Sequence, residues 1–141
     1  MTPEGLPDVG DRASIEHVFT QADIEAFSRL SGDDNPVHLD PEAGMRMGFA
    51  GTIVHGMLAA SLISRLLGTQ LPGPGTIYLS QQLRFRRPIA PGETVVATVE
   101  ITSHREDKPV FEVETTVTVG SETAIEGHAA VLLRPADLTA G

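Results

Sequence analysis

Asp33 and His38 are two side chains, close together in the sequence, that could do chemistry together. They lie in the segment 31–38, whose sequence is SGDDNPVH. Pro36 lacks a backbone N–H and disfavours helix at Asn35, so we expect a tight loop here and not a helix. The side chain of Asn35 is typical of a residue that braces such a turn. A carboxylate and an imidazole that face one water molecule can act as general base and general acid.

A second candidate segment, 53–57 with the sequence IVHGM, begins a long apolar stretch. The first N–H groups of a helix are unpaired and the helix dipole favours negative charge, so they can stabilise an oxyanion. The N–H of Gly56 is our candidate, because glycine lets a ligand come close. His55 is either a direct substrate contact or a residue bonded within the loop, and the sequence does not decide between these two roles.

Composition limits the class of protein. The chain has 141 residues, the usual size of one domain, and we expect a single domain at 12–134 with loose termini at 1–11 and 135–141. Cysteine is absent, which excludes disulfides, a thiol nucleophile and a cysteine-based zinc site. The net charge of −9 argues against nucleic-acid or anionic-membrane binding. No signal pattern is present and no apolar run approaches ~20 residues, so we expect a cytoplasmic protein.

A metal centre is not expected. No pair of histidines has a metal-ligand spacing that is backed by a carboxylate on a helix. The five histidines are His17, His38, His55, His104 and His128.

Hydrophobic periodicity predicts helices in the first half of the chain. Thr20 and Asp23 form a capping pattern before an apolar face that ends at Gly32. Asp40 and Pro41 are typical of the first residues of a second, short helix.

The segment 55–67 is apolar nearly all round, which indicates a buried helix, and Gly68 is expected to end it. After it, the pattern changes to the period of two that is typical of strands. Helices followed by strands predict an α+β fold, with an antiparallel sheet curled around the buried helix. The expected strands are 14–19, 77–86, 94–104, 110–119 and 124–133.

Three stretches of the sequence resemble one known family. The segment 27–38, FSRLSGDDNPVH, is similar to the signature of the R-specific enoyl-CoA hydratases, the MaoC-like branch of the hot-dog fold. The similarity continues at 53–58 and 75–79, within residues 14–133. The resemblance implies the hot-dog fold, with Asp33 and His38 as the catalytic pair.

Members of this family add water reversibly to trans-2-enoyl-CoA and give (R)-3-hydroxyacyl-CoA. The resemblance therefore implies acyl-CoA ligands and a homodimer with acyl tunnels near the subunit interface. The addition of water to a conjugated thioester requires no metal or redox cofactor, so none is expected. The resemblance also implies that Ser64 could hydrogen-bond Asp33 from below. The residues leave open which of Asp33 and His38 is the base. They also leave open the acyl chain length and the pathway, which could be polyester supply, fatty-acid breakdown or secondary metabolism.

Two further groups are candidate substrate contacts. One group lies between the two site segments, and it either lines the acyl tunnel or packs the short helix against the core: Met45, Met47 and Phe49. The other is basic, and it either contacts the phosphates of coenzyme A or pairs with glutamates on a solvated strand face: Arg84, Arg86 and Arg87.

Other functions are compatible with the same residues. A hot-dog thioesterase would use a carboxylate and water to release free CoA. A related dehydratase would act on chains carried by acyl carrier protein, and a silent hot-dog subunit would only bind acyl groups. The complete string from Gly32 to His38, followed by His55-Gly56-Met57, favours hydration.

Overall fold

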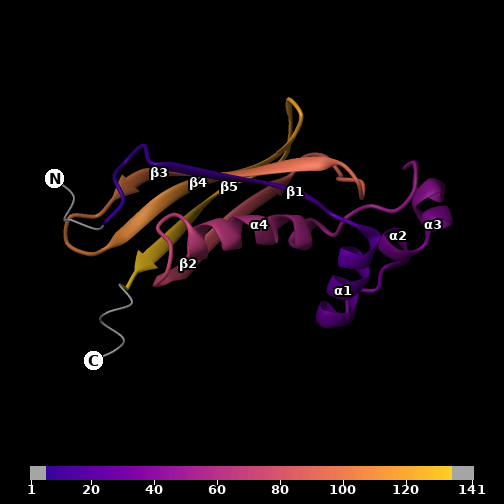
Figure 1. The fold of residues 1–141 in the computed structure, drawn as a ribbon, viewed down its shortest axis with the longest axis horizontal. Helices are drawn as coiled ribbons and strands as arrows, with labels where there is room; N and C mark the ends of the chain where they lie inside the picture. The colour runs from indigo at the N-terminus through magenta and orange to yellow at the C-terminus, as the bar shows by residue number, and fades with distance from the viewer. Residues whose placement is uncertain (1–5, 135–141) are drawn as a thin grey trace.

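The computed structural model describes residues 6–134. Its centre is one antiparallel sheet with the strand order β1-β3-β4-β5-β2. Helix α4 lies along one face of the sheet, and α1, α2 and α3 gather beyond one end of α4 (Figure 1). This arrangement confirms the predicted α+β fold. The elements are β1 (Arg12–Val18), α1 (Gln21–Ser31), α2 (Pro36–Leu39), α3 (Pro41–Arg46), α4 (Gly56–Thr69), β2 (Thr76–Phe85), β3 (Thr94–His104), β4 (Val110–Val119) and β5 (Glu122–Leu133).

The hydrophobic core lies between α4 and the inner face of the sheet. Alternate residues of β3 and β4 point at the helix, and side chains such as Val99 and Phe111 are fully buried. This follows from the period-two pattern, because successive strand side chains point to opposite faces. Apolar burial of this kind contributes ~25 cal/mol per Å². On α4 the buried side chains are Ala59, Ala60, Leu62, Ile63, Leu66 and Leu67.

One side of α4 stays uncovered, unlike the helix buried nearly all round that we predicted. Met57 is 61 % exposed, and Ser64 and Arg65 are exposed as well. The sheet covers only one side of α4, because its strands form a single layer (Figure 1). Strand β2, at the edge of the sheet, also presents exposed apolar side chains: Ile77, Tyr78, Leu79 and Phe85.

The ends of α1 follow the prediction, and the end of α4 does not. The hydroxyl of Thr20 accepts the N–H of Asp23, whose carboxylate accepts the N–H of Thr20. Gly32 ends α1 with a φ of 80°, the left-handed conformation that glycine adopts easily. The predicted stop at Gly68 is wrong, because Gly68 does not adopt that conformation and α4 continues to Thr69.

The segment that we predicted as a loop contains a short helix. Pro36 is the first residue of α2, and the side-chain oxygen of Asn35 accepts the N–H of Val37 at 3.3 Å. Proline suits this position, because the N–H that it lacks would have no helical partner. The expectation of a segment without helix is therefore wrong for α2, which carries His38. The interpretation of Asn35 as a brace is confirmed by its capping bond.

Residues 6–11 are tied to the sheet, although we expected the whole N-terminal segment to be loose. The N–H of Gly10 donates to the carbonyl of Ile101 in β3 at 2.9 Å, which extends the contact between the N-terminal segment and β3. The other expectations for the termini, at 1–5 and 135–141, fall outside the described residues. No helix in the described part of the chain is long and apolar enough to cross a membrane.

Candidate active site

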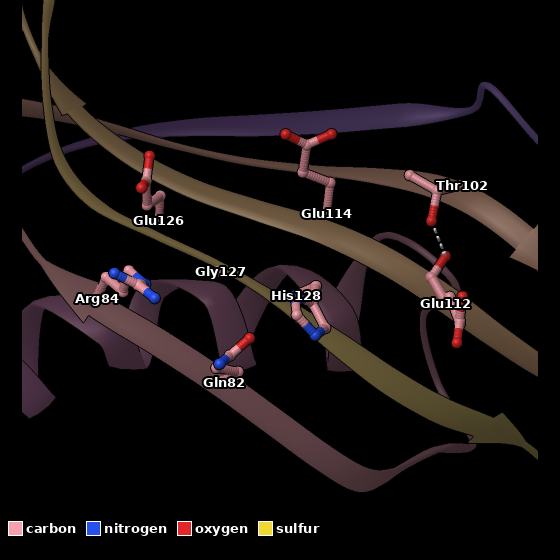
Figure 2. A pocket seen from close by; sticks show the side chains of 8 residues that line it. All are labelled: Gln82, Arg84, Thr102, Glu112, Glu114, Glu126, Gly127 and His128. Carbon is pink, nitrogen blue, oxygen red and sulfur yellow. Dashed lines mark hydrogen bonds between the residues drawn. The ribbon is translucent and has the colours of Figure 1, made fainter.

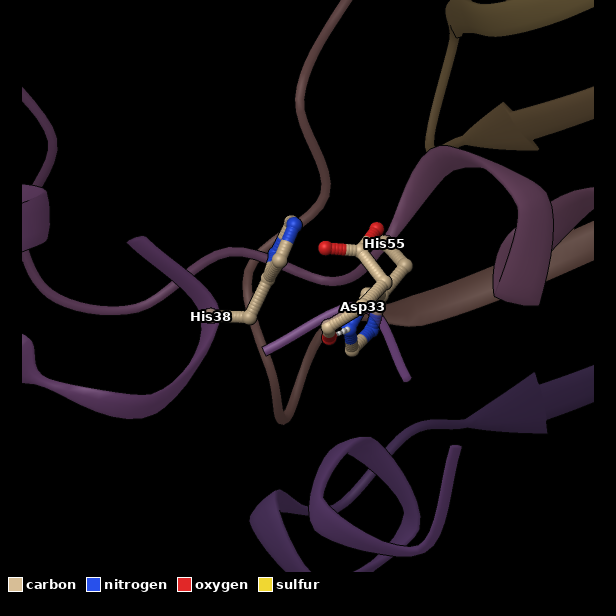
Figure 3. A group of neighbouring side chains, drawn as sticks. All are labelled: Asp33, His38 and His55. Carbon is tan, nitrogen blue, oxygen red and sulfur yellow. Dashed lines mark hydrogen bonds between the residues drawn. The ribbon is translucent and has the colours of Figure 1, made fainter. Parts of the chain in front are cut away.

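Asp33, His38 and His55 come together near the N-terminal end of α4 (Figure 3). One polar atom of each side chain lies within 4.8 Å of those of the other two. Asp33 lies in the loop after α1, His38 on α2, and His55 at the N-cap of α4. In Figure 3 the carboxylate of Asp33 is turned toward the ring of His38. Asp33 is exposed and both histidines are buried, so packing fixes the two rings while the carboxylate stays accessible to a ligand.

The loop holds Asp33 in a defined turn. The N–H of Asp33 donates to the hydroxyl of Ser31 at 3.1 Å. The carboxylate of Asp33 accepts the N–H of Asn35 at 3.3 Å, through Oδ1. Within the described part of the chain its Oδ2 accepts no hydrogen bond and neither oxygen has a basic partner. One carboxylate oxygen is therefore available to a water molecule or a substrate.

His38 is fixed at its ring and at its backbone. Its Nδ1 lies 2.8 Å from the carbonyl oxygen of Ile53, which can only accept, so Nδ1 carries the proton in the neutral ring. The side chain of Gln21 donates to the carbonyl of His38 at 2.8 Å and accepts the hydroxyl of Thr52 at 2.7 Å. Nε2 of His38 is then the nitrogen that can exchange a proton at the site. Sequence reasoning missed Gln21 and Thr52, because their partners are distant in the chain.

His55 packs its ring against that of His38. The ring centroids are 3.8 Å apart with an interplanar angle of 26°, and the ring of Phe27 meets His55 edge-on at 4.8 Å. Nε2 of His55 lies 3.0 Å from the carbonyl oxygen of Asp33 and 3.1 Å from the hydroxyl of Ser28. Sequence reasoning missed Ser28. Its spacing of four residues from the buried Ile24 could have placed it on the inner face of α1.

The three side chains are also of types that ligate metals, and the spacing in the sequence gave no sign of this grouping. Each imidazole already uses one nitrogen on a backbone carbonyl, His38 on Ile53 and His55 on Asp33. These bonds orient the rings without an ion, and the absence of a metal or redox cofactor stays a prediction.

A cavity of about 350 Å³ opens beside His38 and the first turn of α4. Gly56 belongs to its wall, and a Cβ at this position would lie 2.8 Å from Cε1 of Phe85, so any larger residue would displace that ring. His55 makes no side-chain cap to α4, which leaves the N–H of Gly56 available to an anionic group. The remaining wall is mostly apolar: Ile53, Val54, Ala59, Phe85, Pro88, Ile89 and Ile125.

Other candidates from the sequence lie outside this cavity. Met45 and Met47 are 51 % and 63 % exposed, and neither they nor the partly buried Phe49 belongs to the cavity wall. Ser64 lies eight residues after Gly56 on α4, about 12 Å along the axis at ~1.5 Å per residue. The expected bond from Ser64 to Asp33 is not formed in the structure, because the rise of the helix carries Ser64 away from the loop.

The three arginines divide between two places. Arg86 and Arg87 line the cavity, and Arg84 does not. Nε of Arg86 donates to Glu126 at 2.7 Å. Hydrogen bonds from Arg87 and from the N–H of Ala90 hold the pKa of Glu93 below its ordinary value, against the effect of burial. The pairing with glutamates is therefore present for Arg86 and Arg87, two residues that also line the cavity.

Arg84 belongs to a second hollow, of about 410 Å³, on the face of the sheet away from α4 (Figure 2). Glu112, Glu114 and Glu126 point into it beside His128. Glu114 stands opposite His128 on β5 and opposite Glu100 on β3, so carboxylates meet across neighbouring strands. Cross-strand pairs of like charge are unfavourable. Glu126 is paired with Arg86 and Glu100 with Arg12, so Glu112 and Glu114 are the carboxylates of this hollow without a basic partner among residues 6–134. The hollow is separate from the group in Figure 3.

Comparison with known proteins gives one consistent relationship. The family described as "MaoC like domain" matches residues 7–123. The (R)-specific enoyl-CoA hydratase of Aeromonas caviae is 48 % identical over 127 residues, which cover 89 % of this chain and 95 % of that protein. The protein of the same name from Rhodospirillum rubrum is 42 % identical over 124 residues, 88 % of this chain and 86 % of its own.

A solved structure agrees with these sequence matches. The structure described as the (R)-hydratase from A. caviae involved in PHA biosynthesis superimposes with a TM-score of 0.88 and 46 % identity. The match covers 91 % of this chain and 98 % of that one. It confirms the predicted hot-dog fold, in which the antiparallel sheet packs against α4. The chain therefore belongs to the MaoC-like family.

Proposed function

We propose that this chain hydrates trans-2-enoyl-CoA reversibly to (R)-3-hydroxyacyl-CoA. The observation that carries the proposal is the group in Figure 3, an accessible carboxylate beside a fixed imidazole at the start of α4. The relatives from A. caviae and R. rubrum are named for this reaction, which supports the same assignment. The apolar cavity beside His38 and Gly56 suits an acyl thioester.

The reaction needs two proton transfers, and the pair can serve both. Water must lose a proton as its oxygen attacks C3 of the enoyl group, and C2 must gain a proton. Asp33 offers a free carboxylate oxygen, and His38 offers Nε2, because its Nδ1 is bonded to Ile53.

The third requirement is a place for the negative charge that develops on the thioester oxygen. The N–H of Gly56 is the first of α4 and lies at the cavity wall. Unpaired N–H groups and the helix dipole both favour an anion at this point. A single preorganised donor of this kind is typically worth ~3 kcal/mol in the transition state.

Arg86 and Arg87 are our candidate contacts for the phosphates of coenzyme A, because both line the cavity whose wall includes Gly56. Arg84 is not included, since it lies in the hollow on the opposite face of the sheet. On an acidic protein, a polyanionic ligand requires a local group of cations.

We further propose a homodimer that joins two copies along β2. This strand is a sheet edge with exposed apolar side chains, and the uncovered side of α4 lies on the same chain with Met57 exposed. Edge strands pair readily with another chain, and exposed apolar patches mark such interfaces.

The test is turnover of a panel of enoyl-CoAs from short to long chains. Hydration removes the ultraviolet absorbance of the conjugated thioester without releasing a thiol, and chiral analysis of the product should give the R isomer. Thiol release would instead indicate a thioesterase. Turnover of carrier-protein thioesters alone would indicate a dehydratase that acts on acyl carrier protein. If neither CoA thioesters nor carrier-protein thioesters were turned over, the proposal that this chain is an enzyme would be contradicted.

A further inference from the structure

We infer that Ser28 and His55 are positioning residues, which hold the backbone of Asp33 and lock the two stacked imidazoles in opposite tautomers. In this arrangement His38 carries its proton on Nδ1 and His55 carries its proton on Nε2. The catalytic consequence rests on the proposed hydration, whereas the tautomers can be observed without any substrate.

The tautomer of His55 follows from the partners of its two nitrogens. Nε2 lies 3.0 Å from the carbonyl oxygen of Asp33, which has no proton to give. Nε2 must therefore be the donor, and the hydroxyl of Ser28 at 3.1 Å accepts a second branch of the same bond. Nδ1 is buried and has no hydrogen-bond partner among residues 6–134.

The opposite assignment has two faults. A proton on Nδ1 of His55 would be a buried donor without an acceptor, which costs more than an unused lone pair. It would also leave Nε2 without a proton, so that its lone pair would face the carbonyl oxygen of Asp33 at 3.0 Å. For His38 the same reasoning gives the other tautomer, since its Nδ1 faces the carbonyl of Ile53.

Ser28 and His55 are buried, unlike the exposed Asp33, and neither belongs to the cavity wall, so both act through other residues. His55 bonds the peptide carbonyl of Asp33, and its ring face packs on the ring of His38 at a centroid distance of 3.8 Å. One buried side chain therefore fixes both members of the catalytic pair. The ring of Phe27 also contacts the His55 ring edge-on, at a centroid distance of 4.8 Å.

The first experiment measures the tautomers in the wild-type protein at a pH where imidazoles are neutral. Nitrogen-15 spectra of the histidine rings distinguish a protonated Nδ1 from a protonated Nε2. We expect a protonated Nε2 at His55 and a protonated Nδ1 at His38, assigned by comparison with spectra of His55→Gln and His38→Gln. A protonated Nδ1 at His55 would overturn the inference, even if the chain proved to be inactive as a hydratase.

The second experiment uses variants that differ in one bond. The side-chain amide of glutamine reaches as far as Nε2 and can donate to Asp33, so His55→Gln should keep kcat within about 10-fold of wild type. His55→Leu keeps bulk but removes the donor and should lower kcat ~100-fold through misplacement of Asp33, with KM within twofold. The kcat of Ser28→Ala should lie between those of His55→Gln and His55→Leu. Matched controls on the outer face of the sheet, His128→Gln and Ser14→Ala, should leave both constants unchanged.

Equal kcat values for His55→Gln and His55→Leu would show that the donor is not needed and would contradict the positioning role. A change in KM alone would do the same, because it would indicate substrate contact. If His55→Leu fails to fold, Ser28→Ala decides, since it removes only a hydroxyl: a kcat equal to wild type rejects the role of Ser28.

Discussion

Replacing Asp33 by asparagine exchanges an ionisable oxygen for an amide of nearly the same shape. We expect Asp33→Asn to lower kcat by ~100-fold or more, the usual effect of losing an acid–base group. The residue is exposed in a loop, so the melting temperature should change little. The adjacent exposed Asp34→Asn is the control and should stay active. Near-normal turnover by Asp33→Asn would remove Asp33 from the mechanism.

At the scale of single residues, the sequence revealed the groups whose type implies chemistry. Asp33, His38 and Gly56 could be chosen because a carboxylate, an imidazole and a helix-start glycine each suggest a role. Gln21 and Ser28 could not be chosen in this way, because their roles come from partners 17 and 27 residues away in the chain. Amides and hydroxyls bond almost anywhere, so their type alone predicts little.

The element that completes the cavity is the connection from β2 to β3. Arg87 donates to both carboxylate oxygens of Glu93, and the N–H of Ala90 donates to Glu93 as well. These bonds tie the two ends of the connection together around Ile89, which lines the cavity. The ionised side chain of Glu93 therefore helps to hold this part of the cavity wall in place.

This gives a pH-dependent prediction for stability. The pKa of Glu93 is lowered in the folded protein, chiefly by the hydrogen bond from Arg87. Ionised Glu93 therefore stabilises the folded protein fully above the ordinary glutamate pKa of about 4.3. This stabilisation is lost as the pH falls through the lower pKa that Glu93 has in the folded protein. Glu93→Gln should lower the melting temperature at neutral pH. The difference from wild type should shrink on acidification through this window.

The control for this prediction is Glu106→Gln, a change at an exposed residue of the turn between β3 and β4. It should have the same melting temperature as wild type at each pH. A constant difference between Glu93→Gln and wild type from neutral to acid pH would show that ionisation of Glu93 does not stabilise the fold.

The elements themselves were predictable where local and tertiary preferences agree. The capping box of α1 and the alternation of β3 are local patterns that burial reinforces. The end of α4 was mispredicted, since Gly68 stays helical despite the low helix propensity of glycine, and the N–H of Gln70 still donates to the carbonyl of Leu66. The short helix α2 was missed because Pro36 was interpreted as a helix breaker, whereas proline at N1 begins a helix.

At the scale of the whole molecule, the proposed dimer can be tested on β2. Leu79 is 53 % exposed on this edge strand. A charge there would have to be buried between two copies without a partner, so Leu79→Asp should shift the protein from dimer to monomer. Light scattering after size exclusion measures the mass. Leu30→Asp, at a position 86 % exposed on α1, is the control. A wild-type monomer, or a Leu79→Asp dimer, would reject this interface.

The carboxylates on the outer face of the sheet have a consequence for how copies of the chain meet. Two molecules that approached with these faces together would bring Glu112 and Glu114 of each against those of the other. Repulsion between like charges discourages that encounter, and specificity between protein surfaces often depends on such unfavourable alternatives. The apolar edge at β2 carries no such penalty. The carboxylates of Glu112 and Glu114 thus help to exclude back-to-back stacking of two sheets.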